Sequence, residues 1–176
     1  MAIERSGNLP VPAELTIPGS PRRKWQQADT LDLAIGQSSL TATPLQVVRM
    51  MAAVANGGEL VTPRVAQNLG PVVRRADTDE SLSLESEVNR VQGLDSETLT
   101  YVREGLKQCV AHPKGTGYKT VRLTETAIAG KTGTAEVGGK PDHAWFAVYG
   151  PVDRPRYACV VVLEHAGCGG KGAGPV

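Results

Sequence analysis

A lysine set among small and hydroxylated residues is the strongest chemical signal in this chain. It stands in the run AGKTGTAE, residues 129–136, where Lys131 is followed by Thr132, Gly133 and Thr134. On a strand, such a run offers a positive charge, two hydroxyl groups and close access to the backbone in one place. These features suit a site for an anion or a carboxylate. The simpler alternative is a solvated lysine on an edge strand beside a glycine-rich turn.

Two glycine-rich segments with a lysine could suggest a phosphate-binding loop, and both fail its pattern. The pattern G-x-x-x-x-G-K-[ST] needs glycine at position 125, which holds Glu125, and a helix after the lysine, where the chain reads TGTAEVGG. The C-terminal GCGGKGAGPV carries Lys171, but no Ser or Thr follows it and no helix is expected before the chain ends. A nucleotide-binding protein would be stabilised by ATP, and we expect no such effect.

The three cysteines are too few for a disulfide framework. Cys159, His165 and Cys168 have the spacing C-x5-H-x2-C, which matches no common zinc pattern and has no evident fourth ligand. Cys109 continues a helical apolar pattern and Cys159 lies in the apolar run ACVVVL, so both are expected to be small core residues. We therefore expect neither a metal nor a cofactor.

The lysine run is the first of three short β-like runs near the C-terminus. They are TAIAGKTGT, HAWFAVYG and RYACVVVLEH, residues 126–134, 143–150 and 156–165. The second and third are apolar on both alternating faces, which predicts central strands covered by helices on both sides. The linkers GGKPD and PVDRP are too short for a crossover helix, so an antiparallel meander is expected.

A helix is predicted well before the strands, in TPLQVVRMMAAVANGG. Thr43 is its N-cap, Pro44 its first residue and Gln46 the partner in a capping box, while Gly57 and Gly58 stop it. Its apolar residues recur at helical spacing and predict a mostly buried helix. They are Leu45, Val47, Val48, Met51, Ala52, Val54 and Ala55.

A second helix is predicted from Asp95, with Glu97 in its first turn, to the stop at Pro113 and Gly115. Its apolar stripe consists of Leu99, Val102, Leu106 and Cys109. Residues 1–30 indicate irregular structure, and residues 64–93 an exposed ribbon or loop. The predicted fold class is therefore α+β, with an antiparallel β-sheet flanked by helices.

Length and composition fit a single globular domain. The 176 residues are 40% apolar and 21% charged, so a core is expected. Because 19 basic residues face 18 acidic ones, no overall field argues for nucleic acid or an anionic membrane surface. No apolar run has the length of a signal peptide or of a span of about 18 residues. The chain as written is expected to be soluble.

Several of these segments together resemble the C-terminal part of the transpeptidase domain of class B penicillin-binding proteins, in particular the elongation-type members. IAGKTGTAEV, DHAWFAVYGP and GGKGAGPV resemble the end of that domain. LAIGQSSLTATPLQVVRMMAAVANGGELVTPRV resembles its G-Q helix segment, SGNLP its T-G-x-x-L-P-G-E loop, and LTYVREGLKQCVAHPKGTGY the helix before the K-T-G strand. The likeness runs from residue 6 to residue 176.

The resemblance implies a serine β-lactamase/transpeptidase-like fold and a role for four residues. Lys131, Thr132 and Thr134 would hold the terminal carboxylate of a D-alanyl-D-alanine stem peptide or of a β-lactam antibiotic. The backbone N–H of Thr134 would be one of two oxyanion-hole donors, and Gly133 would let substrate approach the strand. His143 and Trp145 are expected to be a strand-end polar residue and a core residue.

The other motifs of the family are missing or doubtful. No serine is followed by lysine three residues on, so the S-x-x-K nucleophile is absent. Ser6 and Asn8 match S-x-N formally, although their setting fits the L-P loop better. The resemblance thus implies that residues 1–176 are the C-terminal portion of the domain, lacking the half with the serine and a C-terminal helix.

Alone, such a chain is expected to be inactive and to expose strand edges and an apolar face, which favours association. The intact parent is expected at the cytoplasmic membrane, with its catalytic domain in the periplasm and a glycosyltransferase as partner. The alternative is a non-catalytic module that keeps the carboxylate site.

Overall fold

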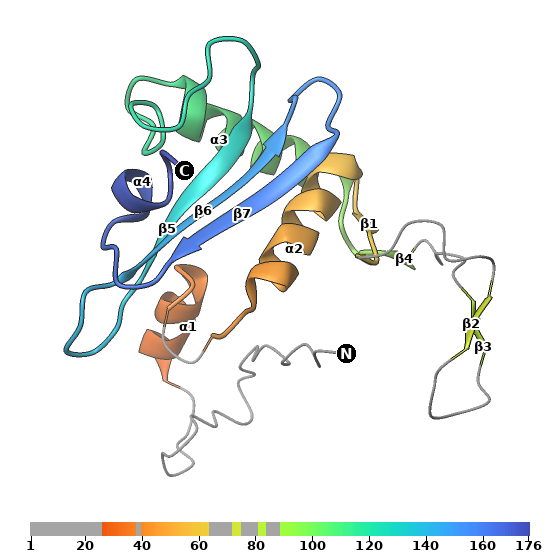
Figure 1. Ribbon diagram of the computed structural model, residues 1–176, viewed down its shortest axis with the longest axis horizontal. Helices are drawn as coiled ribbons and strands as arrows, with labels where there is room; N and C mark the ends of the chain where they lie inside the picture. The colour runs from red at the N-terminus through yellow and green to blue at the C-terminus, as the bar shows by residue number, and fades with distance from the viewer. Residues whose placement is uncertain (1–25, 38–39, 64–71, 75–80, 84–88) are drawn as a thin grey trace.

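The computed structural model shows an α+β fold, as predicted, in which helices flank an antiparallel sheet (Figure 1). It describes residues 26–37, 40–63, 72–74, 81–83 and 89–176. Ser6 and Asn8, the doubtful S-x-N pair, lie outside the described residues.

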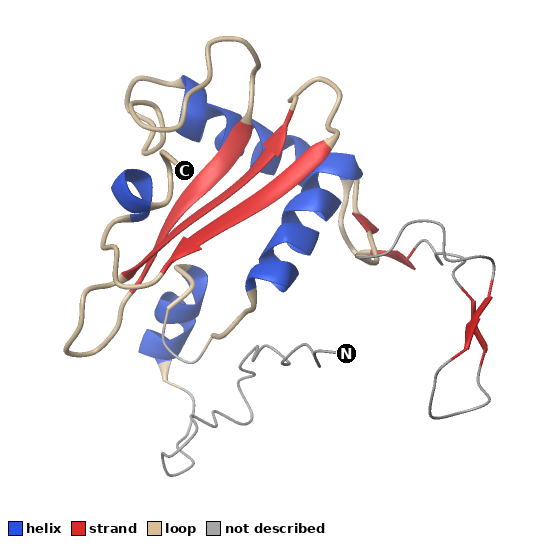
Figure 2. Cartoon of the chain, in the orientation of Figure 1, coloured by secondary structure: helices blue, strands red, loops and turns tan. Residues whose placement is uncertain are grey.

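The main sheet is the predicted meander of three strands (Figure 2). β5 (Ala129–Ala135) pairs with β6 (His143–Gly150), and β6 pairs with β7 (Tyr157–Leu163), both antiparallel. The observed strands agree with the predicted runs to within three residues at each end. Short linkers and alternating apolar residues were therefore sufficient to predict this sheet.

The central strand β6 is buried on both faces, as expected. Ala147 and Tyr149 lie on one face with Ala129 of β5, while Ala144 and Phe146 lie on the other. The same prediction is wrong for β7. Tyr157 is 69% exposed and Cys159 is exposed as well, so β7 is a half-exposed outer strand and Cys159 is not a core residue.

Helix α2 (Pro44–Asn56) begins and ends as predicted. The Thr43 hydroxyl accepts from the Gln46 N–H at 3.2 Å, Gln46 bonds back to the Thr43 N–H at 2.8 Å, and Gly57 closes the helix in a left-handed conformation with φ 98°. The helix packs against β6 and β7 through Met51 and Ala55. Leu45 was expected in the buried stripe but is 38% exposed, because it lies in the first turn beyond that contact.

Helix α3 (Ser96–Ala111) begins one residue after the predicted start, with Asp95 as its N-cap. Leu99 is buried and Leu106 packs on the core below β5. Val102 is 42% exposed, against expectation, and Val110 is buried in its place, because the helix lies along β5 at a different rotation from the predicted stripe.

Arg103 joins α3 to the C-terminal turn of α2. Its Nε donates to the Val54 carbonyl at 2.7 Å, and its Nη2 donates to the Ala55 carbonyl at 3.0 Å. The last carbonyls of a helix have no partner within the helix. A cation there completes their hydrogen bonding and interacts favourably with the negative end of the helix dipole. The two helices are thereby held as one supporting layer.

The segments predicted to be irregular contain more structure than expected. Helix α1 (Gln27–Ala34) begins inside the range 1–30, because Gln26 and Asp29 form a capping box. Within residues 64–93, predicted as a ribbon or loop, β2 (Val72–Arg74) pairs with β3 (Ser81–Ser83), and β4 (Asn89–Arg90) pairs with β1 (Glu59–Leu60), which lies just before this range. Asn89 and Arg90 are exposed, as a surface ribbon requires.

A single helical turn, α4 (Gly169–Gly172), occurs where no helix was expected. It packs on β6 and β5, and Ala173 just after it is fully buried beside Val110, Val121 and Phe146. Glycine is required at position 169, where a Cβ would collide with the Gly133 carbonyl of β5. In the described part of the chain no helix is long and apolar enough to cross a bilayer.

Candidate functional site at the edge of strand β5

The predicted site residues occupy consecutive positions of β5, so their side chains alternate between the two faces of the sheet. Lys131 pairs with Ala147, Thr132 with Phe146 and Thr134 with Ala144. Gly133 turns its bare side toward Trp145, since a Cβ there would lie 3.2 Å from the Trp145 Cβ. The strand therefore has no side chain over Trp145 at this position.

Two backbone carbonyls of β5 accept hydrogen bonds from side chains. Lys131 Nζ donates to the Thr132 carbonyl at 2.7 Å, and Gln37 Nε2 donates to the Thr134 carbonyl at 3.1 Å. Both carbonyls belong to alternate residues, and in an antiparallel strand the N–H and C=O of one residue point to the same side. The N–H groups of Thr132 and Thr134 thus face the outer edge of β5, away from β6.

Lys131 is exposed and lines an open hollow of about 320 Å³ between β5 and the last turns of α3. Lys114 supplies a second ammonium group there. Two cations around one hollow raise the local concentration of anions. The whole lining consists of Gly105, Gln108, Cys109, His112, Lys114, Gly115, Thr116 and Lys131.

The two threonines of the run have different partners. Thr132 is half-buried, and its Oγ1 lies 2.8 Å from the Oγ1 of Thr116 in the loop after α3. Thr134 is exposed, and its Oγ1 accepts from the Gly169 N–H at 3.2 Å. Because the Thr134 hydroxyl accepts in this bond, its own proton is left to donate.

Sequence reasoning named neither Gln37 nor Thr116 as a site residue. Both lie in segments that were matched to the family, the G-Q segment and the loop KGTGY, but nothing local in the chain shows what they contact. Gln37 is 97 residues from Thr134 and Thr116 is 16 from Thr132, so tertiary contact alone brings them together. Cys109, expected in the core, is half-buried with its Sγ 3.2 Å from the Thr116 Oγ1.

Two groups in the elements that support β5 have shifted pKa values. Burial raises the pKa of Tyr149, which pairs with Ala129 at the start of β5, and the nearby Arg103 opposes that shift. The pKa of Asp95 is lowered, chiefly because its carboxylate accepts the backbone N–H of Thr98 and then its hydroxyl. Both groups belong to elements that support β5, and neither lies on the outer edge of that strand.

The other candidate residues do not form a second centre. His143 is half-buried at the start of β6, where its Nδ1 accepts the N–H of His165 at 3.0 Å. Trp145 is half-buried. Among the described residues, no group of three or more His, Cys, Asp and Glu side chains could hold a metal ion, and this covers Cys159 and Cys168.

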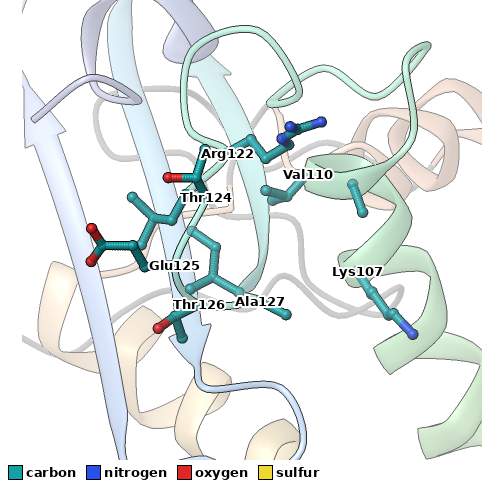
Figure 3. Close-up of a pocket in the computed structure, with 10 residues that line it drawn as sticks. Lys107, Val110, Arg122, Thr124, Glu125, Thr126 and Ala127 are labelled. Carbon is teal, nitrogen blue, oxygen red and sulfur yellow. The ribbon is translucent and has the colours of Figure 1, made fainter.

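A second hollow of about 380 Å³ lies on another side of α3 (Figure 3). Figure 3 shows Lys107 and Val110 of the helix across from Thr124 and Glu125 of the segment that leads into β5. Its lining includes none of the four predicted site residues, so it is separate from the β5 edge.

The chain is similar to known proteins in both sequence and structure. The model of the penicillin binding protein transpeptidase domain matches residues 7–176. The peptidoglycan D,D-transpeptidase MrdA of Haemophilus influenzae is 32% identical over 170 residues, which are 88% of this chain and 25% of that protein. The chain thus spans about a quarter of the length of the curated relatives it matches.

Solved structures give the same result. PBP2 of Pseudomonas aeruginosa in complex with WCK 5153 has a TM-score of 0.67 at 31% identity, over 87% of this chain and 31% of that one. PBP2 of Helicobacter pylori in complex with MreC has a TM-score of 0.67 at 31% identity, over 88% of this chain and 26% of that one.

Proposed function

This chain belongs to the penicillin-binding protein transpeptidase family, and on that premise we propose that it supplies the carboxylate-binding and oxyanion-stabilising side of a peptidoglycan D,D-transpeptidase. One observation carries the proposal. The outer edge of β5 presents an ammonium group, hydroxyl groups and outward backbone N–H groups over four consecutive residues, Lys131 to Thr134. This is the donor set that an acyl-transfer site for a peptide carboxylate needs.

The carboxylate would be the terminal one of a D-alanyl-D-alanine stem peptide or that of a β-lactam. Lys131 has three N–H donors and gives one to the Thr132 carbonyl, so two remain for an anion. Thr132 and Thr134 add hydroxyl protons on the same strand. Charge-assisted hydrogen bonds of this kind are roughly twice as strong as neutral ones, which favours a carboxylate over a neutral group.

The oxyanion donor would be the backbone N–H of Thr134. Gln37 holds the carbonyl of the same residue on the outer edge, so the N–H faces the space that a substrate would occupy. A single donor of this kind contributes about 3 kcal/mol of transition-state stabilisation. Replacing the Thr134 side chain would leave this donor in place, whereas a change in the position of β5 would not.

The reaction would proceed through an acyl-serine. The serine oxygen would attack the carbonyl between the two D-alanines, the C–N bond would break with release of D-alanine, and an amine of a second stem peptide would take the acyl group. No serine of these 176 residues is followed by lysine three residues on. The nucleophile and its base would therefore come from another part of the protein, and the 176 residues alone would be inactive.

Covalent labelling with fluorescent penicillin tests whether the nucleophile comes from another part of the protein. A chain extended to include the serine of the same transpeptidase domain should be labelled, whereas the 176-residue chain should not. The labelled chain should lose most of its labelling rate on Lys131→Ala. Stable labelling of the 176-residue chain at any hydroxyl would contradict the proposed division.

A second candidate function, a non-catalytic binding module, is favoured by the absence of the S-x-x-K pattern from the sequence. It predicts that the 176 residues alone bind a peptide ending in D-alanyl-D-alanine and that Lys131→Ala abolishes this binding. Titration with such a peptide, followed by NMR shift changes along β5, distinguishes the two. Binding without labelling supports the module, and absence of both supports a piece of a larger enzyme.

The whole protein is proposed to be anchored in the cytoplasmic membrane, with its catalytic domain in the periplasm and a glycosyltransferase beside it. The partner named for a solved relative is MreC, which supports association with a protein of that kind as well. Affinity purification of the whole protein from membranes would show which of the two partners it retains.

A further inference from the structure

A threonine outside the K-T-G run holds the middle residue of that run. The Thr116 Oγ1 lies 2.8 Å from the Thr132 Oγ1 and 3.2 Å from the Cys109 Sγ. The two threonines come from different elements, the loop after α3 and strand β5. Three side chains thus form a continuous hydrogen-bonded row that ends at the proposed carboxylate site.

The loop backbone places Thr116 tightly. A Cβ on Gly115 would collide with the carbonyl of Cys109, and the Gly117 N–H donates to that same carbonyl at 3.0 Å. On the other side, a Cβ on Gly170 of α4 would lie 2.9 Å from the Thr116 carbonyl. The loop is therefore packed closely against the end of α3 and against α4, which places the Thr116 hydroxyl beside Thr132.

The number of available protons decides which side chain donates in each hydrogen bond of this row. A hydroxyl has one proton, and Thr132 must donate its proton to hold a carboxylate. Only the lone pairs of Thr132 then remain for Thr116, so Thr116 donates to Thr132. The lone pairs of Thr116 in turn accept the S–H proton of Cys109. Hydrogen bonds that point the same way polarise one another, which strengthens the last donor in the row.

We propose that Thr116 is a positioning residue for the carboxylate site. It turns the Thr132 proton toward the ligand and prevents it from being donated elsewhere. The inference rests on the proposed function, because it assigns Thr116 a task only if Thr132 contacts a carboxylate. Lys131 supplies the charge, whereas Thr116 sets the direction of the neighbouring donor.

The test uses a chain extended to include the serine of the same transpeptidase domain, with that serine replaced by alanine so that the peptide is bound and not consumed. It is titrated with a tripeptide ending in D-alanyl-D-alanine and with the C-terminal amide of that tripeptide. Thr116→Val keeps the shape of the side chain and removes the hydroxyl. It should weaken binding of the acid about tenfold, the size expected when Thr132 no longer donates its proton to the carboxylate. Binding of the amide should change less than twofold. Thr116→Ser should restore binding of the acid, and Thr124→Val, on an exposed threonine, is the matched control.

A double-mutant cycle with Thr132→Val separates positioning from a general structural effect. If Thr116 acts through Thr132, then Thr116→Val should cost almost nothing once Thr132 is valine. An equal loss in both backgrounds, or an equal loss for acid and amide, would overturn the role of Thr116. No binding by the unsubstituted extended chain, or no effect of Thr132→Val in it, would overturn the proposed carboxylate site itself.

Discussion

The two outer strands of the sheet, β5 and β7, have seven residues each and pair with the same central strand, but they differ in residue types and in the contacts that they make. β5 has two glycines and three polar residues, and Gln37, Thr116 and Gly169 reach it from three other segments. β7 reads YACVVVL, contacts α2 on one face and leaves Tyr157 69% exposed.

The difference shows two ways of treating the edge of a sheet. At the β5 edge, Gln37, Thr116 and Gly169 each make a hydrogen bond to Thr132 or Thr134, so several polar groups of this edge have set partners. The β7 edge is defined by apolar area alone, which many partners could cover. The β5 edge, for which we propose a binding role, thus has neighbours that order its hydrogen-bonding groups, whereas the β7 edge offers mainly apolar area.

The largest effect on stability is expected from Gly169→Ala, on the β5 side. The added Cβ would collide with the Gly133 carbonyl and lie 2.5 Å from the Trp145 carbonyl, so α4 must move away from the sheet. Overpacking of this kind costs about 1–3 kcal/mol of unfolding free energy, measured by denaturant unfolding. Gly105→Ala, in open space on α3, should instead stabilise the chain by about 1 kcal/mol. Equal stability of Gly169→Ala and the unsubstituted chain would contradict the close packing.

A smaller loss is expected from Gln37→Leu, which removes the donor to the Thr134 carbonyl. One partly exposed hydrogen bond contributes about 0.5–1 kcal/mol of unfolding free energy. The NMR signals of Thr132 and Thr134 should shift while those of β7 stay in place. Gln92→Leu, at an exposed turn, is the control. Similar changes in both variants would show that Gln37 does not order this edge.

The third effect depends on pH and concerns the start of α3, the helix beside β5. The pKa of Asp95 is below its ordinary value of 3.8 in the folded chain, so its stabilising effect is present above about pH 4 and is lost as the pH falls through the folded pKa. Asn also caps helices but does not titrate. The melting temperature of the unsubstituted chain relative to Asp95→Asn should therefore fall between pH 6 and pH 3, and a constant difference would refute the shift.

The smallest effect on stability is expected at the β7 edge. Tyr157→Lys replaces an exposed aromatic ring and should change the unfolding free energy by less than about 0.5 kcal/mol. The same lysine should reduce self-association, since charge on an edge strand opposes pairing with another chain. Analytical ultracentrifugation would measure this. Unchanged association would show that chains meet through another surface.

The parts of the fold that follow local rules were predictable from sequence. The caps at Thr43 and Asp95, the stop at Gly57 and the order of the three strands all depend on residues close together in the chain. The apolar pattern of β7 indicates that this strand can pack against other apolar residues, but it does not show which of its two faces is covered. The glycine-rich α4 has no helical periodicity, and packing on β5 and β6 holds its single turn.

The site was predictable in part. Lys131 to Thr134 stand out because lysine, hydroxyls and glycine adjoin in the sequence. Their positions on β5 agree with the predicted strand, while their binding role stays a prediction. Thr116 and Gln37 could not be inferred, because a polar residue in a loop carries no local sign of a distant partner.

The Arg103 link between α2 and α3 also bears on where the hollow beside Lys131 lies. Its guanidinium joins α3 to the last carbonyls of α2. Cys109 lies six residues further along the helix, about 9 Å at 1.5 Å per residue, and Val110 next to it is buried against Phe146 and Ala173. The helix is therefore fastened at two separate points, to α2 and to the sheet. The hollow lined by Lys131 lies beside the second of these points, so its shape depends on core packing as well as on polar contacts.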